Sequence, residues 1–115
     1  MIRHTELDKC PIVSAIREIG SEWNFILIRY LMTRSMGFNE LLREAKGISS
    51  KTLSNNLKTL ASRGIVKRDV VATQPFNVSY SLTEKGLALK EVLDLLGKWG
   101  NRWTSVSERN NHEIQ

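Results

Sequence analysis

The sequence predicts a mainly α-helical domain that carries one small β-hairpin, an α+β class, and three observations predict it. Apolar residues recur with helical spacing in five stretches, which begin near residues 11, 22, 38, 49 and 84. Two short runs, 65–71 and 78–82, instead alternate apolar and polar side chains, as strands do. A chain of 115 residues, 41% of them hydrophobic and 25% charged, can form one core but not two. We therefore expect a single domain over 1–115, with its core at about 10–103 and flexible tails at 1–9 and 104–115.

The charge and the cysteine content narrow the class of partner and the compartment. A formal net charge of +5 and an isoelectric point near 9.7 favour a polyanion or an anionic surface as partner. The sequence has no apolar run of about eighteen residues, and residues 1–8 lack the hydrophobic segment of a signal peptide. The single cysteine, Cys10, excludes an internal disulfide. These features predict a cytoplasmic protein.

The first two helices are expected to contribute the centre of the core. Pro11 suits the first position of a helix, and Gly20 suits its end. The buried side of this helix is expected to be aliphatic: Ile12, Val13, Ile16 and Ile19. A second helix begins near Glu22 and carries apolar residues on most of its sides, so we expect it to lie innermost.

A helix-turn-helix outline follows. Residues 38–45 predict a short helix, Lys46 and Gly47 form a turn, and a second helix covers about 49–63. Ser49 or Ser50 suits the N-cap of that second helix, and Gly64 suits the left-handed residue that ends it. Its buried stripe is expected at i, i+4, i+7 and i+8: Leu53, Leu57, Leu60 and Ala61.

The opposite face of the 49–63 helix carries cations and short polar side chains without a carboxylate. Between Glu44 and Asp69 the charged residues are all basic: Lys46, Lys51, Lys58, Arg63, Lys67 and Arg68. Amides, hydroxyls and cations near a helix N-terminus can read base edges and bind phosphates in a DNA major groove. A solvated surface helix that happens to lack acids fits this stretch equally well, so the rest of the chain has to decide.

The C-terminal half predicts a hairpin and a long helix. The strand at 65–71 is expected to place Ile65, Lys67, Asp69 and Val71 on one side and Val66, Arg68 and Val70 on the other. Residues 72–77 form the loop, 78–82 the second strand, and Thr83 caps one helix from about 84 to 103. That helix has more apolar surface than a small domain can cover, so a partner subunit is expected. Three helices, a hairpin and a helix are the order of a winged helix-turn-helix with an added C-terminal helix.

The chain resembles the HxlR-type winged-helix regulators of bacteria and archaea, in the MarR-like superfamily. The resemblance covers roughly residues 10 to 100 and follows an ordered set of segments: Cys10-Pro11, 19–23, 26–27, 38–41, 47–53, Leu57, Leu60, 64–66, Arg68, 80–83, Gly86 and Trp99-Gly100. It implies a homodimer that binds a pseudo-palindromic operator and controls a neighbouring promoter. It further implies that helix 49–63 enters the major groove, that hairpin 65–82 is the wing at the minor groove, and that the terminal helices form the dimer interface.

Candidate site residues follow from the residue types and the resemblance. The candidates for DNA binding are Asn39, Lys46, Ser50, Lys51, Thr52, Ser54, Asn55, Lys58, Arg68, Gln74 and Asn77. Within this set, base edges are expected for Lys51, Thr52, Ser54 and Asn55, and phosphates for Ser50 and Lys58. The expected wing tip, Pro75-Phe76-Asn77, has no cation, and Glu22 stands where relatives often carry a lysine. The candidates for the dimer interface are Ile12, Ile16, Leu89, Val92, Leu93, Leu96, Trp99 and Trp103.

Cys10 has two interpretations. A thiol at the start of a helix can have a lowered pKa, and some members of the resembled family use a matching cysteine to detect oxidants or electrophiles. The alternative is a small buried apolar residue, which is the commonest environment of a free cysteine. An oxidant or small-molecule effector is therefore conceivable from the sequence, but no polar constellation identifies a pocket for one.

Other function classes are less well supported. The sequence has no clustered nucleophile, acid–base pair or Gly-rich phosphate loop, so we expect no catalytic site and no enzyme. His4, His112 and Cys10 lack metal-ligand spacing, so neither a metal nor a cofactor is expected. The main alternative is a winged-helix protein-interaction adaptor without sequence-specific DNA binding. The acid-free stretch from Lys46 to Arg68 favours DNA over that alternative and over double-stranded RNA, whose major groove is too narrow for a helix.

Overall fold

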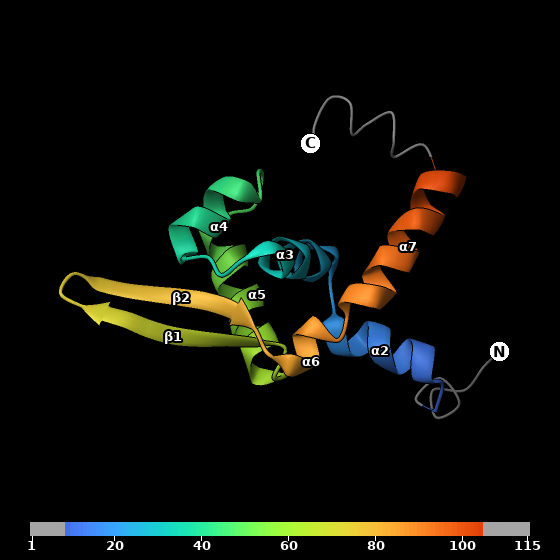
Figure 1. Cartoon of the computed structure of the whole chain (residues 1–115), viewed down its shortest axis with the longest axis horizontal. Coiled ribbons are helices and arrows are strands. Elements are labelled where there is room, and N and C mark those ends of the chain that lie inside the picture. The colour runs from blue at the N-terminus through green and yellow to red at the C-terminus, as the bar shows by residue number, and fades with distance from the viewer. Residues whose placement is uncertain (1–8, 105–115) are drawn as a thin grey trace.

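A computed structural model describes residues 9–104 and confirms the mainly helical class with one hairpin (Figure 1). The elements in chain order are α2 (Pro11–Ile19), α3 (Glu22–Thr33), α4 (Phe38–Glu44), α5 (Ser50–Ser62), β1 (Val66–Thr73), β2 (Phe76–Leu82), α6 (Glu84–Leu87) and α7 (Lys90–Trp103). The expected tails, with His4 and His112, fall outside the described residues except at positions 9 and 104. Within residues 9–104, no helix has both the length and the hydropathy needed to cross a membrane.

The core forms where α3 meets α4, α5 and the base of the hairpin. Leu27 and Ile28 of α3 are fully buried, as the apolar character of this helix predicted. They pack in one cluster with residues from the other elements, among them Leu41, Leu53, Leu57, Leu60, Ile65, Val66 and Leu82. Ala61 is exposed, so the expected stripe of α5 is one residue too wide. At 100° per residue Ala61 lies about 70° from the centre of the three buried leucines, at the edge of the contact.

The hairpin is longer and its turn tighter than the sequence suggested. β1 pairs with β2 antiparallel from Val66↔Leu82 to Thr73↔Phe76, so the loop expected at 72–77 is wrong and only Gln74 and Pro75 lie between the strands. The peptide bond between these two residues is cis. A register shift lies between Val70 and Ala72. Val71 is the extra residue of this bulge, and an extra residue reverses the alternation of side chains. The expectation that Val71 and Arg68 lie on opposite faces of the hairpin is therefore also wrong.

A short bridge connects the helix-turn-helix to the hairpin. Met36, in the connection between α3 and α4, donates its N–H to the Tyr80 carbonyl (3.0 Å) and accepts from the Tyr80 N–H (2.8 Å). β2 is therefore the inner strand, and its position relative to α4 is fixed by backbone hydrogen bonds. The start of α4 approaches β2 so closely that a Cβ on Gly37 would lie 3.3 Å from the Val78 carbonyl.

The last helical segment is interrupted. One helix from 84 to 103 was expected, but α6 ends at Leu87 and α7 begins at Lys90. Thr83 caps α6 as predicted, because its hydroxyl accepts from the Gly86 N–H at 3.2 Å. The cause of the interruption lies in how α6 is held. Gly86 is buried against the Ile65 carbonyl, and the next turn tightens, with the Leu89 N–H bonding to Gly86 at 3.1 Å.

The apolar faces of α2 and α7 point away from the core. Ile12 and Ile16 are 72% and 53% exposed, so the expectation that they pack inside their own chain is wrong, and Ile19 alone of α2 is buried. No residue of α7 is buried. Figure 1 shows both helices on the side of the molecule opposite the hairpin tip. Their unpartnered faces match the prediction of more apolar surface than one chain covers.

Polar contacts join the end of α2 to the end of α5. Arg63 donates from Nη1 to the carbonyls of Arg17 (2.8 Å) and Glu18 (2.7 Å). Lys85 of α6 donates to the Glu18 carboxylate (2.5 Å) and to the Arg63 carbonyl (2.7 Å). The Lys85 ammonium, as hydrogen-bond donor and positive charge, holds the pKa of Glu18 below its usual value of 4.5. Two of the last carbonyls of α2 and one at the end of α5 thus have cationic donors.

Candidate nucleic-acid interface

α5 is defined at both ends by local chemistry. Ser49 is the N-cap: its hydroxyl oxygen accepts from the Thr52 N–H at 3.1 Å and its O–H donates to the Thr52 hydroxyl at 2.9 Å. Gly64 follows the helix with φ +72, a conformation that a residue with a Cβ adopts at a cost. These two residues set where α5 begins and where it ends.

The exposed face of α5 carries the predicted site residues. Four of them are exposed: Ser50, Lys51, Asn55 and Lys58. Thr52 and Ser54 are half-buried. Helical geometry places Lys51, Asn55 and Lys58 opposite the buried leucines. Because Thr52 accepts the Ser49 hydroxyl, its own O–H remains directed elsewhere and can donate to a partner.

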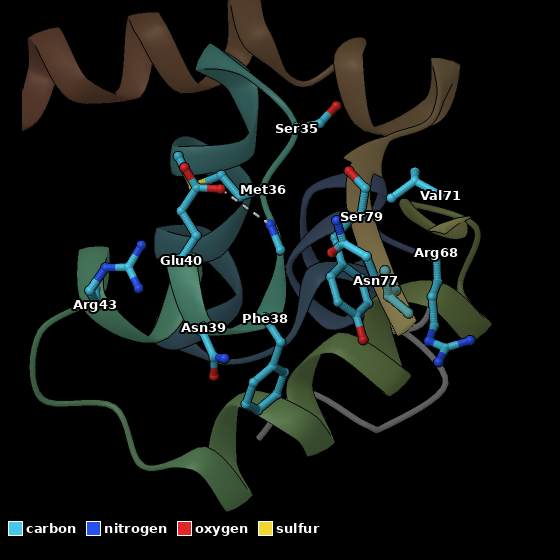
Figure 2. Close-up of a pocket in the computed structure, with 13 residues that line it drawn as sticks. Ser35, Met36, Phe38, Asn39, Glu40, Arg43, Arg68, Val71, Asn77 and Ser79 are labelled. Carbon is cyan, nitrogen blue, oxygen red and sulfur yellow. Dashed lines mark hydrogen bonds between the residues drawn. The ribbon is translucent and has the colours of Figure 1, made fainter. Parts of the chain in front are cut away.

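The six cations of the acid-free stretch separate into two groups. Three of them, Lys46, Lys51 and Lys58, are exposed on or beside α5. Arg63 is occupied by the carbonyls at the end of α2, and Lys67 lies 4.0 Å from the Asp69 carboxylate. Arg68 is exposed and lines a separate groove (Figure 2). The positively charged surface on and beside α5 therefore contains three of the six cations and not all of them.

A groove of about 680 Å³ lies between α4 and the hairpin, and we call it the α4–wing groove (Figure 2). It is lined by Ser35, Met36, Gly37, Phe38, Asn39, Glu40, Arg43, Arg68, Val71, Asn77, Val78, Ser79 and Tyr80. The structure thus brings together three predicted site residues, Asn39, Arg68 and Asn77. Gln74, at the exposed tip, does not line it.

Sequence reasoning missed Arg43 as a site residue. It follows Asn39 by four residues on α4, so both side chains project from one face of the helix, and this spacing could have indicated it. The pairing of Arg68 with Tyr80 across the hairpin needed the strand register, which the sequence does not provide.

The acid in the α4–wing groove is already neutralised. One oxygen of the Glu40 carboxylate is paired with the Arg34 guanidinium, and the other accepts from the Gly37 N–H at 3.3 Å. The Arg34 hydrogen bond holds the pKa of Glu40 below its usual value of 4.5. The two remaining cations of the groove, Arg43 and Arg68, therefore give it a net positive character.

Cys10 occupies the N-cap position of α2. Its side chain is half-buried and makes no capping hydrogen bond, while its carbonyl accepts from the Ser14 N–H at 2.9 Å. The thiol is therefore not the fully buried apolar group that one interpretation required. No three His, Cys, Asp or Glu side chains converge in the part of the chain that the structure describes.

Comparisons with known proteins place these features in a family. The model of the HxlR-like helix-turn-helix family matches residues 18–108. The HTH-type regulator YvaP of Bacillus subtilis is 34% identical over 101 residues, which cover 87% of this chain and 94% of that protein. YodB of the same organism is 37% identical over 95 residues, covering 82% and 85%.

Solved structures agree. Reduced YodB superposes with a TM-score of 0.74 at 36% identity, covering 84% of this chain and 95% of that one, and YodB is also known in diamide-treated and quinone-bound forms. The redox regulator HypR in its reduced form superposes with a TM-score of 0.78 at 32% sequence identity, and the match covers 87% of this chain and 99% of that one. From its sequence and its winged helix-turn-helix architecture alike, the chain belongs to the HxlR family of transcriptional regulators.

Proposed function

We propose that this regulator binds operator DNA as a homodimer, with α5 in the major groove and the wing, formed by β1 and β2, at the minor groove. The exposed face of α5 carries the proposal, since it presents Lys51, Asn55 and Lys58 without a neighbouring acid. α5 is held by the core through its leucine stripe, so this face is presented rigidly. Membership of a transcriptional regulator family supports DNA as the partner.

The roles of the α5 residues follow from their chemistry. Asn55 can pair bidentately with adenine, and Lys51 can contact guanine, each worth roughly 1–3 kcal/mol of discrimination. Thr52 and Ser54 supply shorter hydroxyl contacts beside them. Ser50 and Lys58 are assigned to phosphates on the two sides of the groove, with Lys46 in the preceding turn.

The dimer interface is assigned to the exposed apolar faces of α2 and α7. Val92, Leu96, Trp99 and Trp103 are between 54% and 64% exposed and recur at helical spacing on one side of α7. Ile12 and Ile16 add to this surface from α2. Leu89 and Leu93 are instead half-buried against their own core, so they attach the start of α7 to it. Burial of one contiguous apolar surface against its own copy is typical of two-fold homodimers.

Selection of bound fragments from a random duplex library tests the DNA assignment directly. We expect enrichment of two inverted half-sites whose centres are separated by about 10–10.5 bp or a multiple, as two-fold-related recognition helices require. A protein-interaction adaptor would enrich no sequence. Enrichment of a single half-site would contradict the dimeric arrangement while retaining the assignment of α5.

We also propose that Cys10 makes the regulator thiol-responsive. Half-buried Cys10, at the N-cap of α2, precedes the helix assigned to the dimer interface. HypR is a redox regulator, and the structure of YodB is known after diamide treatment and with quinone bound. Diamide should accept two electrons and join the Cys10 thiols of two subunits in one disulfide, itself being reduced to the hydrazine, and the wild-type protein should then leave its operator, as measured by fluorescence anisotropy. Dithiothreitol should reduce the disulfide and restore binding. Cys10→Ser should bind equally well before and after treatment. If diamide releases both proteins from the operator equally, Cys10 is not the group that responds to the oxidant.

A further inference from the structure

The α4–wing groove lies between α4 and the wing, the second of the two elements assigned to DNA, and no role in the duplex contact has been derived for it. It is open to solvent and lined mainly by polar groups, with Asn39 and Arg43 on α4 and Arg68 and Asn77 on the hairpin. Figure 2 shows Arg43 and Arg68 on opposite sides of the opening, with Asn39 between them at its lower edge. A small apolar effector would find little apolar surface here.

The charge of the groove favours an extended anion. The Glu40 carboxylate is neutralised by Arg34 and by the Gly37 N–H, so it does not repel an anion as a free acid would. Arg43 and Arg68 then contribute two positive charges on two different elements. A DNA strand carries one negative charge per about 3.4 Å of helix axis, so a strand lying along the groove can present phosphates to the guanidinium groups on both of its sides.

The backbone of β2 adds a donor on the same side. Tyr80 directs both its N–H and its carbonyl to Met36, on the edge of the hairpin that faces α4. In an antiparallel ladder the residue two positions away points to the same edge, so the N–H of Val78 is directed toward the groove. A backbone N–H on a strand edge requires a partner, and a phosphate oxygen is a strong acceptor.

From this arrangement we infer that the α4–wing groove seats the sugar–phosphate strand that separates the major groove read by α5 from the minor groove at the wing. Arg43 and Arg68 bind its phosphates, and Asn39 and Asn77 donate beside them. The inference rests on the proposed function and adds to it that Arg68, on the wing, binds the sugar–phosphate backbone and does not read the minor groove. The ion pair of Glu40 with Arg34 offsets the one negative charge in the groove that would repel a phosphate.

The test is the salt dependence of operator binding, measured by fluorescence anisotropy between 50 and 200 mM salt with the duplex obtained from the library selection. Arg43→Ala and Arg68→Ala should each lower the slope of log K against log salt by about 0.9, which is about eightfold in affinity near 0.1 M. Both should weaken all duplex sequences alike, leaving the ranking of base substitutions unchanged. Arg43→Lys and Arg68→Lys should retain the slope, because the charge remains.

Controls separate this inference from the proposed function. Arg29→Ala removes an exposed cation of α3 that lies beside α7, and it should leave the slope at the wild-type value. Phosphate ethylation interference should lose one phosphate signal in Arg43→Ala, at the strand between the half-site and its flanking minor groove. Unchanged slopes in both alanine variants, with a lowered slope in Lys58→Ala, would overturn the groove assignment while α5 keeps its role. Failure of the wild type to bind any duplex would overturn both.

Discussion

Lys58 lies on the exposed side of α5, opposite the buried leucines, and its assignment to a phosphate can be tested by itself. Lys58→Ala should weaken binding to all duplex sequences alike and reduce the salt slope by about one, because a single phosphate contact is lost. The matched variant Asn55→Ala should instead relax the preference for one base pair at a cost of roughly 1–3 kcal/mol and leave the slope unchanged. A salt-independent effect of Lys58→Ala would show that its side chain does not meet the backbone.

The pairing of Glu18 with Lys85 predicts a pH dependence of stability. Because the pKa of Glu18 is lowered in the folded state, its contribution is fully present above the ordinary value of 4.5 and is lost as the pH falls through the lower folded value. The melting temperature of Glu18→Gln should therefore fall less steeply than that of the wild type on acidification below pH 4.5. Glu91→Gln, an exposed acid of α7, controls for the change in net charge.

At the residue scale, the sequence identified the exposed face of α5, because the apolar periodicity defined the opposite one. The spacing of the leucines in α5 placed Lys51, Asn55 and Lys58 on the exposed side, and the structure agrees. The sequence could not show that Arg63 is committed to α2, because its partners are backbone carbonyls 45 and 46 residues away. A count of cations along the chain does not distinguish a structural guanidinium from a free one.

At the scale of elements, Gly86 is where α6 meets the base of the hairpin. A Cβ at this position would lie 2.4 Å from the Ile65 carbonyl and 3.0 Å from the Leu82 side chain. Gly86→Ala should therefore destabilise the protein by about 1–3 kcal/mol or more, since the backbone must shift, and urea unfolding measures this. Gly97→Ala provides the control: its Cβ would meet no heavy atom within 4 Å, so the substitution should stabilise α7 by up to about 1 kcal/mol.

The bounds of the elements were predicted best where a capping residue stands at the end of a stretch with helical periodicity. Ser49 and Gly64 bound α5, and Thr83 begins α6, as their residue types indicated. The hairpin turn and the interruption before Lys90 were missed for a common reason. Both depend on contacts across the fold, namely continued strand pairing to Thr73 and the anchoring of Gly86, and local propensity carries neither.

At the scale of the whole molecule, the exposed tryptophans of α7 predict a dimer that can be dissociated without unfolding the chain. Trp99 is 60% exposed, so Trp99→Ala should leave the core intact while weakening the dimer. A central aromatic anchor costs about 2 kcal/mol or more on truncation, which is at least about a thirtyfold loss in the dimer equilibrium. Sedimentation velocity should detect the monomer, and operator affinity should fall with it. Lys98→Ala, on the polar side of α7, should remain dimeric.

The order of elements, and with it the fold class, was accessible from the sequence because each helix and strand carried its own period. The outward direction of Ile12 and Ile16 was not, since an amphipathic helix shows which residues seek burial but not whether its own chain or a second one covers them. The sequence therefore placed these residues in both a core and an interface. The structure removes the first of these two roles.

The contacts of Arg63 with the final carbonyls of α2 have a mechanical consequence. Two charge-assisted hydrogen bonds, with Lys85 bracing them from α6, would have to break before α2 could tilt without α5. In the proposed dimer, α2 and α5 would therefore turn together, so a change in the angle between the subunits would change the direction of both α5 helices. A change at Cys10, at the other end of α2, would then alter the spacing of the two α5 helices that we propose contact the operator.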